Sequence, residues 1–138
     1  MKTTKEIGAI GEEAAERFLK KRGWRILSRN FLVRGGEIDI IAFRFGVLAF
    51  FEVKSRTNED FGTPASAVDF EKLRKIKTAS RAFLTAYERG GRIPVFYPFG
   101  IEKKRTVRKR RIDVIEVYLS KDYKPLRINQ IKDRENQL

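Results

Sequence analysis

Three charged residues, Asp39, Glu52 and Lys54, lie within strand-like runs of the largely apolar stretch of residues 36–56. The interior of a sheet disfavours charged side chains, so these three need a chemical reason to be there. Carboxylates bind hard cations, and a lysine can hold or deprotonate an attacking water or neutralise a developing charge. The stretch therefore indicates a candidate site for metal-assisted chemistry.

A tight turn at residues 45–46 would bring these residues together. The turn contains a glycine, which adopts positive φ at little cost, and strand-like runs lie on both sides of it. A hairpin centred there sets Asp39 opposite Glu52 and Glu37 opposite Lys54, with opposed residues on one face. Two facing carboxylates repel each other, so a structural role does not explain them. Charges left exposed at the ends of two strands are the alternative.

A divalent cation between Asp39 and Glu52 would remove that repulsion. Mg²⁺ (or Mn²⁺) suits the place, because it binds one or two carboxylates together with waters and phosphate oxygens of a substrate. Lys54 then lies where it can act on the attacking water or on the scissile phosphate. We therefore predict Asp39, Glu52 and Lys54 as catalytic residues for metal-assisted hydrolysis of a phosphodiester.

Two predicted helices each offer one charged residue to the hairpin. The first follows a capping box formed by Thr3 and Glu6, and it carries Glu12 at the edge of its apolar stripe, placed to reach the sheet as a third metal-site acid. The second covers residues 64–89 and carries Lys72 at the edge of its own stripe. The alternatives are an ordinary surface glutamate and a lysine that extends its ammonium group to water.

The composition of the whole chain limits the kinds of catalysis and metal binding that its side chains can support. It has no Cys and no His, which excludes disulfides, thiol nucleophiles, imidazole bases and zinc sites built from these residues. Its 31 Lys and Arg residues against 18 Asp and Glu residues give a net charge of +13. Such a surplus favours a polyanionic partner, nucleic acid ahead of a membrane, over a merely soluble surface. No run reaches transmembrane length, so we expect a cytoplasmic protein.

A basic segment late in the chain could grip phosphates as a loop or β-arm, with an affinity that falls as salt rises. It contains no aromatic residue, so it does not predict stacking on unpaired bases, and a solvated charge run is the alternative. With Arg56 and Lys72, the predicted nucleic-acid contacts are Lys103, Lys104, Arg105, Arg108, Lys109, Arg110 and Arg111.

The order of the predicted elements is α-β-β-β-α-β-β, which is an α/β fold with a mixed sheet flanked by helices. The later strands are expected at residues 93–99 and 112–119. We predict a single domain over residues 1–120 and a polar C-terminal extension over residues 121–138, partly disordered.

Several motifs together resemble the YraN-like family. They are G-x-x-G-E-x-x-A at residues 8–15, G-E-I-D at residues 36–39 and F-E-V-K-S-R at residues 51–56, followed by Lys72 and by R-I-D-V-I at residues 111–115. The family is similar to the restriction-endonuclease-like, PD-(D/E)xK superfamily and most of all to archaeal Holliday junction resolvases. One position departs from the superfamily name, because Ile38 stands where the name has Pro.

The resemblance implies a restriction-endonuclease-like core, with Glu12, Asp39 and Glu52 as metal-site acids and Lys54 as the catalytic lysine. It also implies a Mg²⁺-dependent, structure-selective DNA endonuclease. Resolvases act as dimers, and the apolar residues 93–99 are the only stretch that suggests a homodimer here. The alternatives are a non-catalytic DNA- or RNA-binding module on the same fold and a basic protein associated with RNA.

Overall fold

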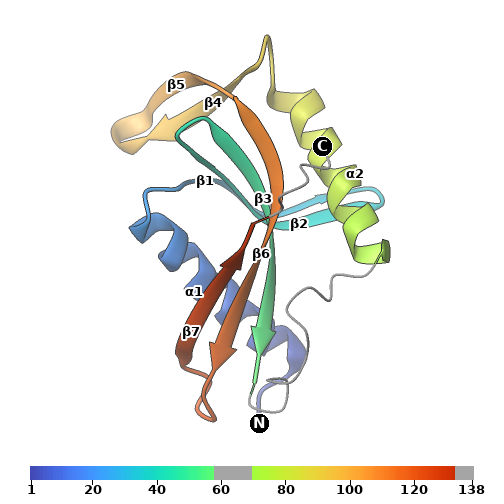
Figure 1. Ribbon diagram of the computed structural model, residues 1–138, viewed down its shortest axis with the longest axis vertical. Coiled ribbons are helices and arrows are strands. Elements are labelled where there is room, and N and C mark those ends of the chain that lie inside the picture. Colours follow the sequence, from blue (N-terminus) through green and yellow to red (C-terminus); the bar gives the residue numbers. More distant parts are fainter. Residues whose placement is uncertain (58–69, 133–138) are drawn as a thin grey trace.

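The computed structural model describes residues 1–57 and 70–132 of the chain, and it has the mixed α/β architecture that the sequence predicts (Figure 1). A five-stranded sheet has the order β1-β2-β3-β6-β7, and β4 and β5 form a separate two-stranded sheet. The elements are α1 (Thr4–Lys21), β1 (Arg25–Val33), β2 (Gly36–Arg44), β3 (Val47–Arg56), α2 (Phe70–Tyr87), β4 (Arg92–Tyr97), β5 (Ile101–Thr106), β6 (Lys109–Leu119) and β7 (Pro125–Ile131). This arrangement is compatible with a restriction-endonuclease-like core.

Helix α1 begins at the predicted capping box. The backbone N–H of Glu6 donates to Oγ1 of Thr3 at 3.1 Å, and the N–H of Thr3 donates to Oε1 of Glu6 at 3.0 Å. These bonds satisfy two backbone donors that a helix start otherwise leaves open. The buried face of α1 includes Ala15 and Leu19, which pack on one side of the main sheet.

Helix α2 covers the opposite side of the sheet, where Ile76, Ala79 and Phe83 are buried against β2 and β3 (Figure 1). The predicted apolar stripe is therefore confirmed at its centre, although Tyr87 at its end is exposed. The predicted start of this helix at residue 64 lies outside the described residues. The sheet thus has two apolar faces, each covered by one helix, which is why its central strands are almost wholly buried.

The β2–β3 hairpin has the predicted register. Arg44 pairs with Val47, and the ladder continues to the pair of Ile40 and Phe51. Strand β3 then pairs in parallel with β6, and β6 pairs antiparallel with β7. The mixed sheet is therefore confirmed, with β3 at its centre.

The second half of the chain decides between two alternatives and corrects one prediction. Of the loop and the β-arm that the basic segment allows, the structure has the β-arm, since residues 101–106 form β5, which pairs with β4. The domain does not end at residue 120, since Pro125–Ile131 forms the edge strand β7. Most side chains of both strands are exposed, so neither strand shows the apolar pattern that burial would impose. Neither α1 nor α2, the helices of the described residues, is apolar enough to span a membrane.

Candidate active site

Strands β2 and β3 separate at the point where the predicted acids lie. Their ladder ends at Ile40 and Phe51, one position before Asp39 and Glu52. Ile40 packs in the core under α1, whereas Ile38 packs in the core under α2. Positions two apart share a face in a regular strand, so β2 changes face at Asp39. Asn30 lies across from this point in β1 and has a left-handed φ of 51°, so both strands twist here together.

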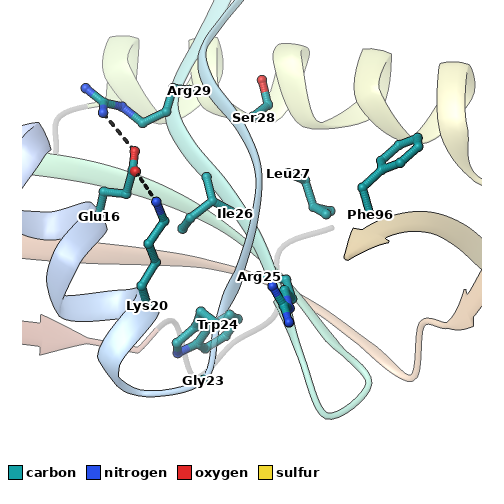
Figure 2. Close-up of a pocket in the computed structure, with 10 residues that line it drawn as sticks. All are labelled: Glu16, Lys20, Gly23, Trp24, Arg25, Ile26, Leu27, Ser28, Arg29 and Phe96. Carbon is teal, nitrogen blue, oxygen red and sulfur yellow. Dashed lines mark hydrogen bonds and ion pairs between the residues drawn. The ribbon is translucent and has the colours of Figure 1, made fainter. Parts of the chain in front are cut away.

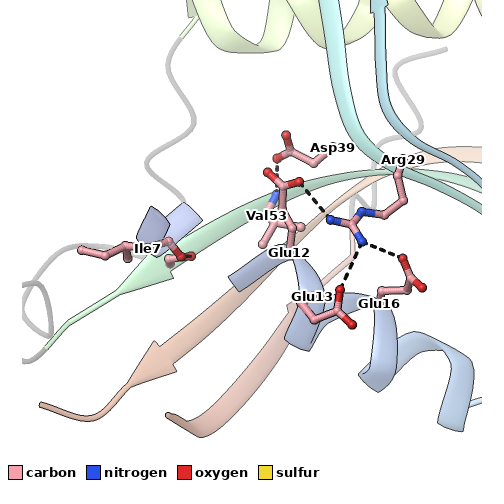
Figure 3. A network of polar contacts seen from close by, with 8 residues as sticks. Ile7, Glu12, Glu13, Glu16, Arg29, Asp39 and Val53 are labelled. Atoms are coloured by element: carbon pink, nitrogen blue, oxygen red, sulfur yellow. Dashed lines mark hydrogen bonds and ion pairs between the residues drawn. The ribbon is translucent and has the colours of Figure 1, made fainter. Parts of the chain in front are cut away.

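The carboxylate of Asp39 accepts a hydrogen bond from β3 at the point where the backbone hydrogen bonds between β2 and β3 stop. Its Oδ2 accepts a hydrogen bond from the backbone N–H of Val53 at 2.8 Å (Figure 3). The side chain of Asp39 thereby lies beside Glu52, the residue before Val53. The two acids therefore lie close together, as predicted. They do so where the two strands separate, and not because they pair with each other in the ladder.

Lys72 of α2 lies between two acids of this site. Its Nζ is 3.1 Å from Oε1 of Glu37 and 3.4 Å from Oε1 of Glu52. Helix α2 approaches β2 closely because Gly36 is there, and a Cβ on that glycine would lie 2.7 Å from backbone atoms of the helix. Glu37 therefore contacts Lys72, and the predicted opposition of Glu37 and Lys54 is not formed, because the strands have already diverged.

Burial and proximity both disfavour the charged forms of the two acids. Glu52 is only 4% exposed, and this burial, together with the nearby charge of Asp39, raises its pKa to about 7, while Lys72 and Lys54 act to lower it. Burial is also the largest cause that raises the pKa of Asp39, against the hydrogen bond from Val53, which lowers it. The pair thus holds a proton more readily than ordinary carboxyl groups do.

Glu12 of α1 lies beside Asp39 (Figure 3). The helix lies close to β3 because Gly11 leaves room for Ser55, whose Oγ would be 1.8 Å from a Cβ at that position. Burial and then the charge of Asp39 raise the pKa of Glu12, while Arg29 lowers it. Nη2 of Arg29 is 3.5 Å from Oε1 of Glu12. We call Glu12, Asp39 and Glu52 the carboxylate fork.

The carboxylate fork suits a hard divalent cation in its chemistry. Its three members offer carboxylate oxygens, and each has a pKa raised in part by a neighbouring acid. A cation between them would reverse that effect and hold all three ionised. Among the described residues, no three acidic side chains lie close enough together to enclose a metal ion. The residue types fit Mg²⁺ or Mn²⁺, and the assignment of the ligands stays a prediction.

Lys54 lies on the same side of β3 as Glu52. Side chains alternate along a strand, and Leu48 and Phe50, which precede Glu52 at the same parity, pack in the core under α2. Lys54 is half-buried, and its charge lowers the pKa of Glu52. The predicted catalytic lysine is therefore near the carboxylate fork at the open end of the hairpin.

Two arginines predicted to contact nucleic acid are buried in ion pairs. Arg56 is 8% exposed, and its Nε lies 3.2 Å from Oε2 of Glu116. Arg111 is also 8% exposed, and its Nε donates to both oxygens of Asp113 at 3.0 and 3.2 Å. Since both guanidinium groups neutralise buried carboxylates, these two residues serve the fold, and the prediction for them needs correction.

The rest of the basic segment divides into two groups. Arg110 is half-buried and pairs with Glu88 at the end of α2. The other five residues are Lys103, Lys104 and Arg105 of β5, Arg108 between β5 and β6, and Lys109 at the start of β6. Of these, Lys104, Arg105 and Arg108 lie near the turn between β2 and β3. The backbone shows this contact directly, since the N–H of Arg108 donates to the carbonyl oxygen of Gly46 at 2.7 Å.

Sequence reasoning missed the aromatic ring that accompanies this basic group. Tyr97 of β4 lies beside β5, and its hydroxyl accepts a hydrogen bond from Nε of Arg105 at 2.9 Å. Arg25 of β1 lies over the same ring, 4.6 Å from its centroid. Only the pairing of β4 with β5 brings these residues together, so no local pattern could have revealed the contact.

A separate hollow of about 730 Å³ lies along β1 (Figure 2). Phe96 of β4 and several residues of β1 line it. Two of its three cations are already paired, because Glu16 lies 2.7 Å from Lys20 and 2.8 Å from Arg29, and only Arg25 has no acidic ion-pair partner among the described residues. The hollow therefore offers little charge for an anionic ligand.

Comparison with known proteins gives one consistent result. A family model described as "Uncharacterised protein family UPF0102" matches residues 11–117, a range that holds the carboxylate fork, Lys54 and Lys72. A UPF0102 protein of Dictyoglomus thermophilum is 41% identical over 122 residues, which are 88% of this chain and 90% of the relative. One of Caldanaerobacter subterraneus is 36% identical over 116 residues, which are 84% and 82% of the two chains.

A third relative, a UPF0102 protein of Clostridium perfringens, is 36% identical over 132 residues, which are 96% of this chain and 95% of that protein. The likeness therefore extends over nearly the whole length of both chains and is not confined to one motif. The chain belongs to the UPF0102 family, the YraN-like family that its motifs resemble.

Proposed function

We propose that this protein is a Mg²⁺- or Mn²⁺-dependent DNA endonuclease of the PD-(D/E)xK type, similar to archaeal Holliday junction resolvases. The observation that carries the proposal is the approach of two carboxyl groups with raised pKa values, that of the buried Glu52 and that of the half-buried Asp39. Such a pair costs stability in a protein that has no use for it. A site that recruits a cation gives the pair a use.

In this proposal the chain's own residues have separate tasks. Asp39, Glu52 and Glu12 hold the cation, and the hydrogen bond from Val53 keeps the carboxylate of Asp39 in place. When bound, Mg²⁺ or Mn²⁺ supplies the positive charge that makes a phosphodiester open to attack by water. Lys54 orients the attacking water or neutralises charge on the phosphate. Lys72 pairs with Glu37 and Glu52 and holds their carboxylates in position.

The substrate class follows from the surface charge. A net charge of +13 and the exposed basic residues of β5 and β6 suit the phosphate backbone of DNA. Branched DNA is the expected substrate, and the protein is expected to act in the cytoplasm, as a homodimer where two strands are cut.

A non-catalytic DNA- or RNA-binding module is the second candidate, and the basic surface supports it equally well. The two candidates differ in what the acids do. In a binding module, neutral variants of Asp39 or Glu52 should bind nucleic acid as well as the wild type or better, because a repulsive charge is removed.

The test is cleavage of labelled four-way junction, flap, duplex and single-stranded DNA in Mg²⁺, in Mn²⁺ and in EDTA. We expect metal-dependent cutting by the wild type and no cutting by Asp39→Asn or Glu52→Gln. Asp122→Asn and Glu13→Gln make the same chemical changes at exposed positions, and they should cut like the wild type. Tight binding without cutting in any metal would favour the binding module. Cutting by the Asp39 and Glu52 variants would indicate a contaminating nuclease.

A further inference from the structure

A second hollow, of about 610 Å³, lies at the turn between β2 and β3. We call it the turn pocket. Five cationic residues line it, and none of its described lining residues is acidic. The five are Arg25, Arg44, Lys104, Arg105 and Arg108. Among the described residues, only Lys104 of these five has an acidic ion-pair partner, Glu102 at 3.5 Å. The turn pocket therefore has more unpaired positive charge than the hollow along β1, with which it shares Arg25.

Aromatic rings lie among these cations. The guanidinium carbon of Arg25 is 4.6 Å from the centre of the Tyr97 ring, and that of Arg105 is 5.2 Å from it. The guanidinium of Arg44 lies 6.0 Å from the ring of Phe45. Cations beside ring faces at the edge of an open pocket are the arrangement that proteins use to bind the bases and phosphates of single strands.

Phe45 is the feature that a folding argument does not explain. Its side chain is 89% exposed, so it contributes little to the core. Its φ is 46°, in the left-handed region that disfavours bulky residues, and Asn or Gly is the usual residue at such a turn position. An exposed ring held in a disfavoured conformation is unfavourable for the fold in both respects. This combination points to a role of Phe45 in binding.

The rest of the turn is firmly placed. Gly46 also has a positive φ, of 80°, and the side chain of Arg108 packs over it, since a Cβ there would lie 3.1 Å from Cδ of that arginine. The N–H groups of Arg108 and Lys109 both donate to the carbonyl oxygen of Gly46. Arg108 and the first residue of β6 thus hold the β2–β3 turn, and the ring of Phe45 projects from a supported backbone.

We propose that the turn pocket binds an unpaired nucleotide of DNA, with its base stacked on Phe45 and its phosphates held by the surrounding arginines. This proposal rests on the proposed function for its choice of DNA. At the ~3.3 Å rise of a strand, β3 carries the chain about 20 Å from the turn to Glu52. A branched substrate could therefore place a displaced strand in the turn pocket and its duplex at the carboxylate fork.

The test is DNA binding in EDTA, followed by fluorescence anisotropy, so that no cutting is needed. One probe is a labelled duplex with a single-stranded overhang, the second is the same duplex with blunt ends, and the third has an overhang of abasic sugar phosphates. The wild type should bind the normal overhang about 10-fold more tightly than the abasic one, as base stacking on an aromatic residue predicts. The duplex with the abasic overhang should still bind more tightly than the blunt duplex, because its overhang adds phosphates.

Phe45→Asn is the decisive variant, because asparagine tolerates the left-handed conformation and should leave the melting temperature unchanged or higher. It should bind the normal and abasic overhangs equally. Phe45→Leu, which keeps apolar bulk without a ring, should lose the same preference. Phe99→Asn is a matched control, because Phe99 is also fully exposed with a positive φ of 66° but does not line the turn pocket.

Equal binding of normal and abasic overhangs by the wild type would overturn the proposal, as would a preference that survives in Phe45→Asn. The outcome is separate from that of the cleavage test. A base preference in EDTA that depends on Phe45, in a protein that never cuts DNA, would support the turn pocket and contradict only the nuclease.

Discussion

The two ends of the β2–β3 hairpin differ in the sign of their charge and in how the fold tolerates it. At the open end, the acids of the carboxylate fork lie partly or wholly buried, and their pKa values are raised first by burial and then by a neighbouring acid, which is Asp39 for Glu12 and Glu52 and Glu37 for Asp39. At the turn, arginines gather with few acidic partners, but water screens their charges. The fork therefore carries an electrostatic cost, whereas the turn pocket carries mainly the conformational cost at Phe45.

This difference indicates a division of tasks. Buried groups of like charge suit a small ligand of opposite charge that is held at close range, such as a divalent cation. Exposed cations suit a long polyanion that is held loosely at many points. Changes at the open end should therefore affect the chemical step and stability, and changes at the turn should affect affinity.

The largest expected effect separates chemistry from affinity. Lys54→Ala should lower the rate of cleavage at saturating protein by about 100-fold or more, because it removes a group that acts on the reacting atoms, and it should leave DNA affinity in EDTA nearly unchanged. Lys104→Ala, the same change in the turn pocket, should weaken binding and leave the saturated rate alone. Single-turnover cleavage and anisotropy measure the two quantities. The division would be wrong if Lys54→Ala altered only affinity.

The second prediction concerns stability and pH. A raised pKa means that folded Glu52 binds a proton more tightly than the unfolded chain does, so its contribution to stability is complete below pH 4.5 and is lost as pH rises to about 7. The difference between a pKa of 4.5 and one of about 7 corresponds to about 3 kcal/mol. Glu52→Gln should therefore raise the free energy of unfolding at pH 8 by about 1–3 kcal/mol.

Urea unfolding of both proteins from pH 4 to pH 8, without metal, measures this effect. The difference between them is the informative quantity, because acids with lowered pKa values, such as Glu16, act in the opposite direction in both. Glu13→Gln, at an exposed carboxylate, should show almost no difference. A Glu52→Gln protein less stable than the wild type at pH 8 would show that the pair with Lys72 outweighs the burial.

A smaller effect is expected at the helix α1 side of the fork. Glu12→Gln should raise the Mg²⁺ concentration needed for half-maximal cleavage by about 10-fold, because the cation loses one anionic ligand or its support. Its neighbour Glu13 faces solvent and should have no such effect. Equal effects from the two substitutions would place Glu12 outside the metal site.

The smallest expected effect is at the turn pocket. Arg108→Gln should reduce the slope of log affinity against log salt by about 0.9, the value for one phosphate contact, and weaken binding a few-fold at moderate salt. Arg110→Gln removes a charge two residues away that Glu88 already neutralises, and it should hardly change the slope. Identical slopes for the two variants would contradict a specific role for the turn pocket.

Local patterns were enough to predict the capping box, the hairpin register and the mixed sheet, because each depends on a few neighbouring residues or on a simple alternation. The approach of Asp39 to Glu52 was also predicted. Its form was not, since the change of face in β2 depends on the twist that Asn30 shares with it.

Long-range partners were beyond the reach of the sequence. A run of basic residues looks uniform, yet Arg111 is buried with Asp113, Arg110 pairs with Glu88, and Arg105 contacts Tyr97. Strand β7 was missed for a related reason: an edge strand with most side chains in water needs no apolar alternation. The partners of these arginines and the position of β7 depend on which distant segments the sheet brings together. A short window of sequence does not contain that information.

The claim that the carboxylate fork exists to bind a divalent cation is tested most directly by calorimetric titration of Mg²⁺ and Mn²⁺ into the protein at pH 8. We expect saturable binding to the wild type and a matching rise in melting temperature, both absent in Glu52→Gln and Asp39→Asn. Wild-type protein that binds neither ion, or Glu52→Gln protein that binds them equally well, would contradict it.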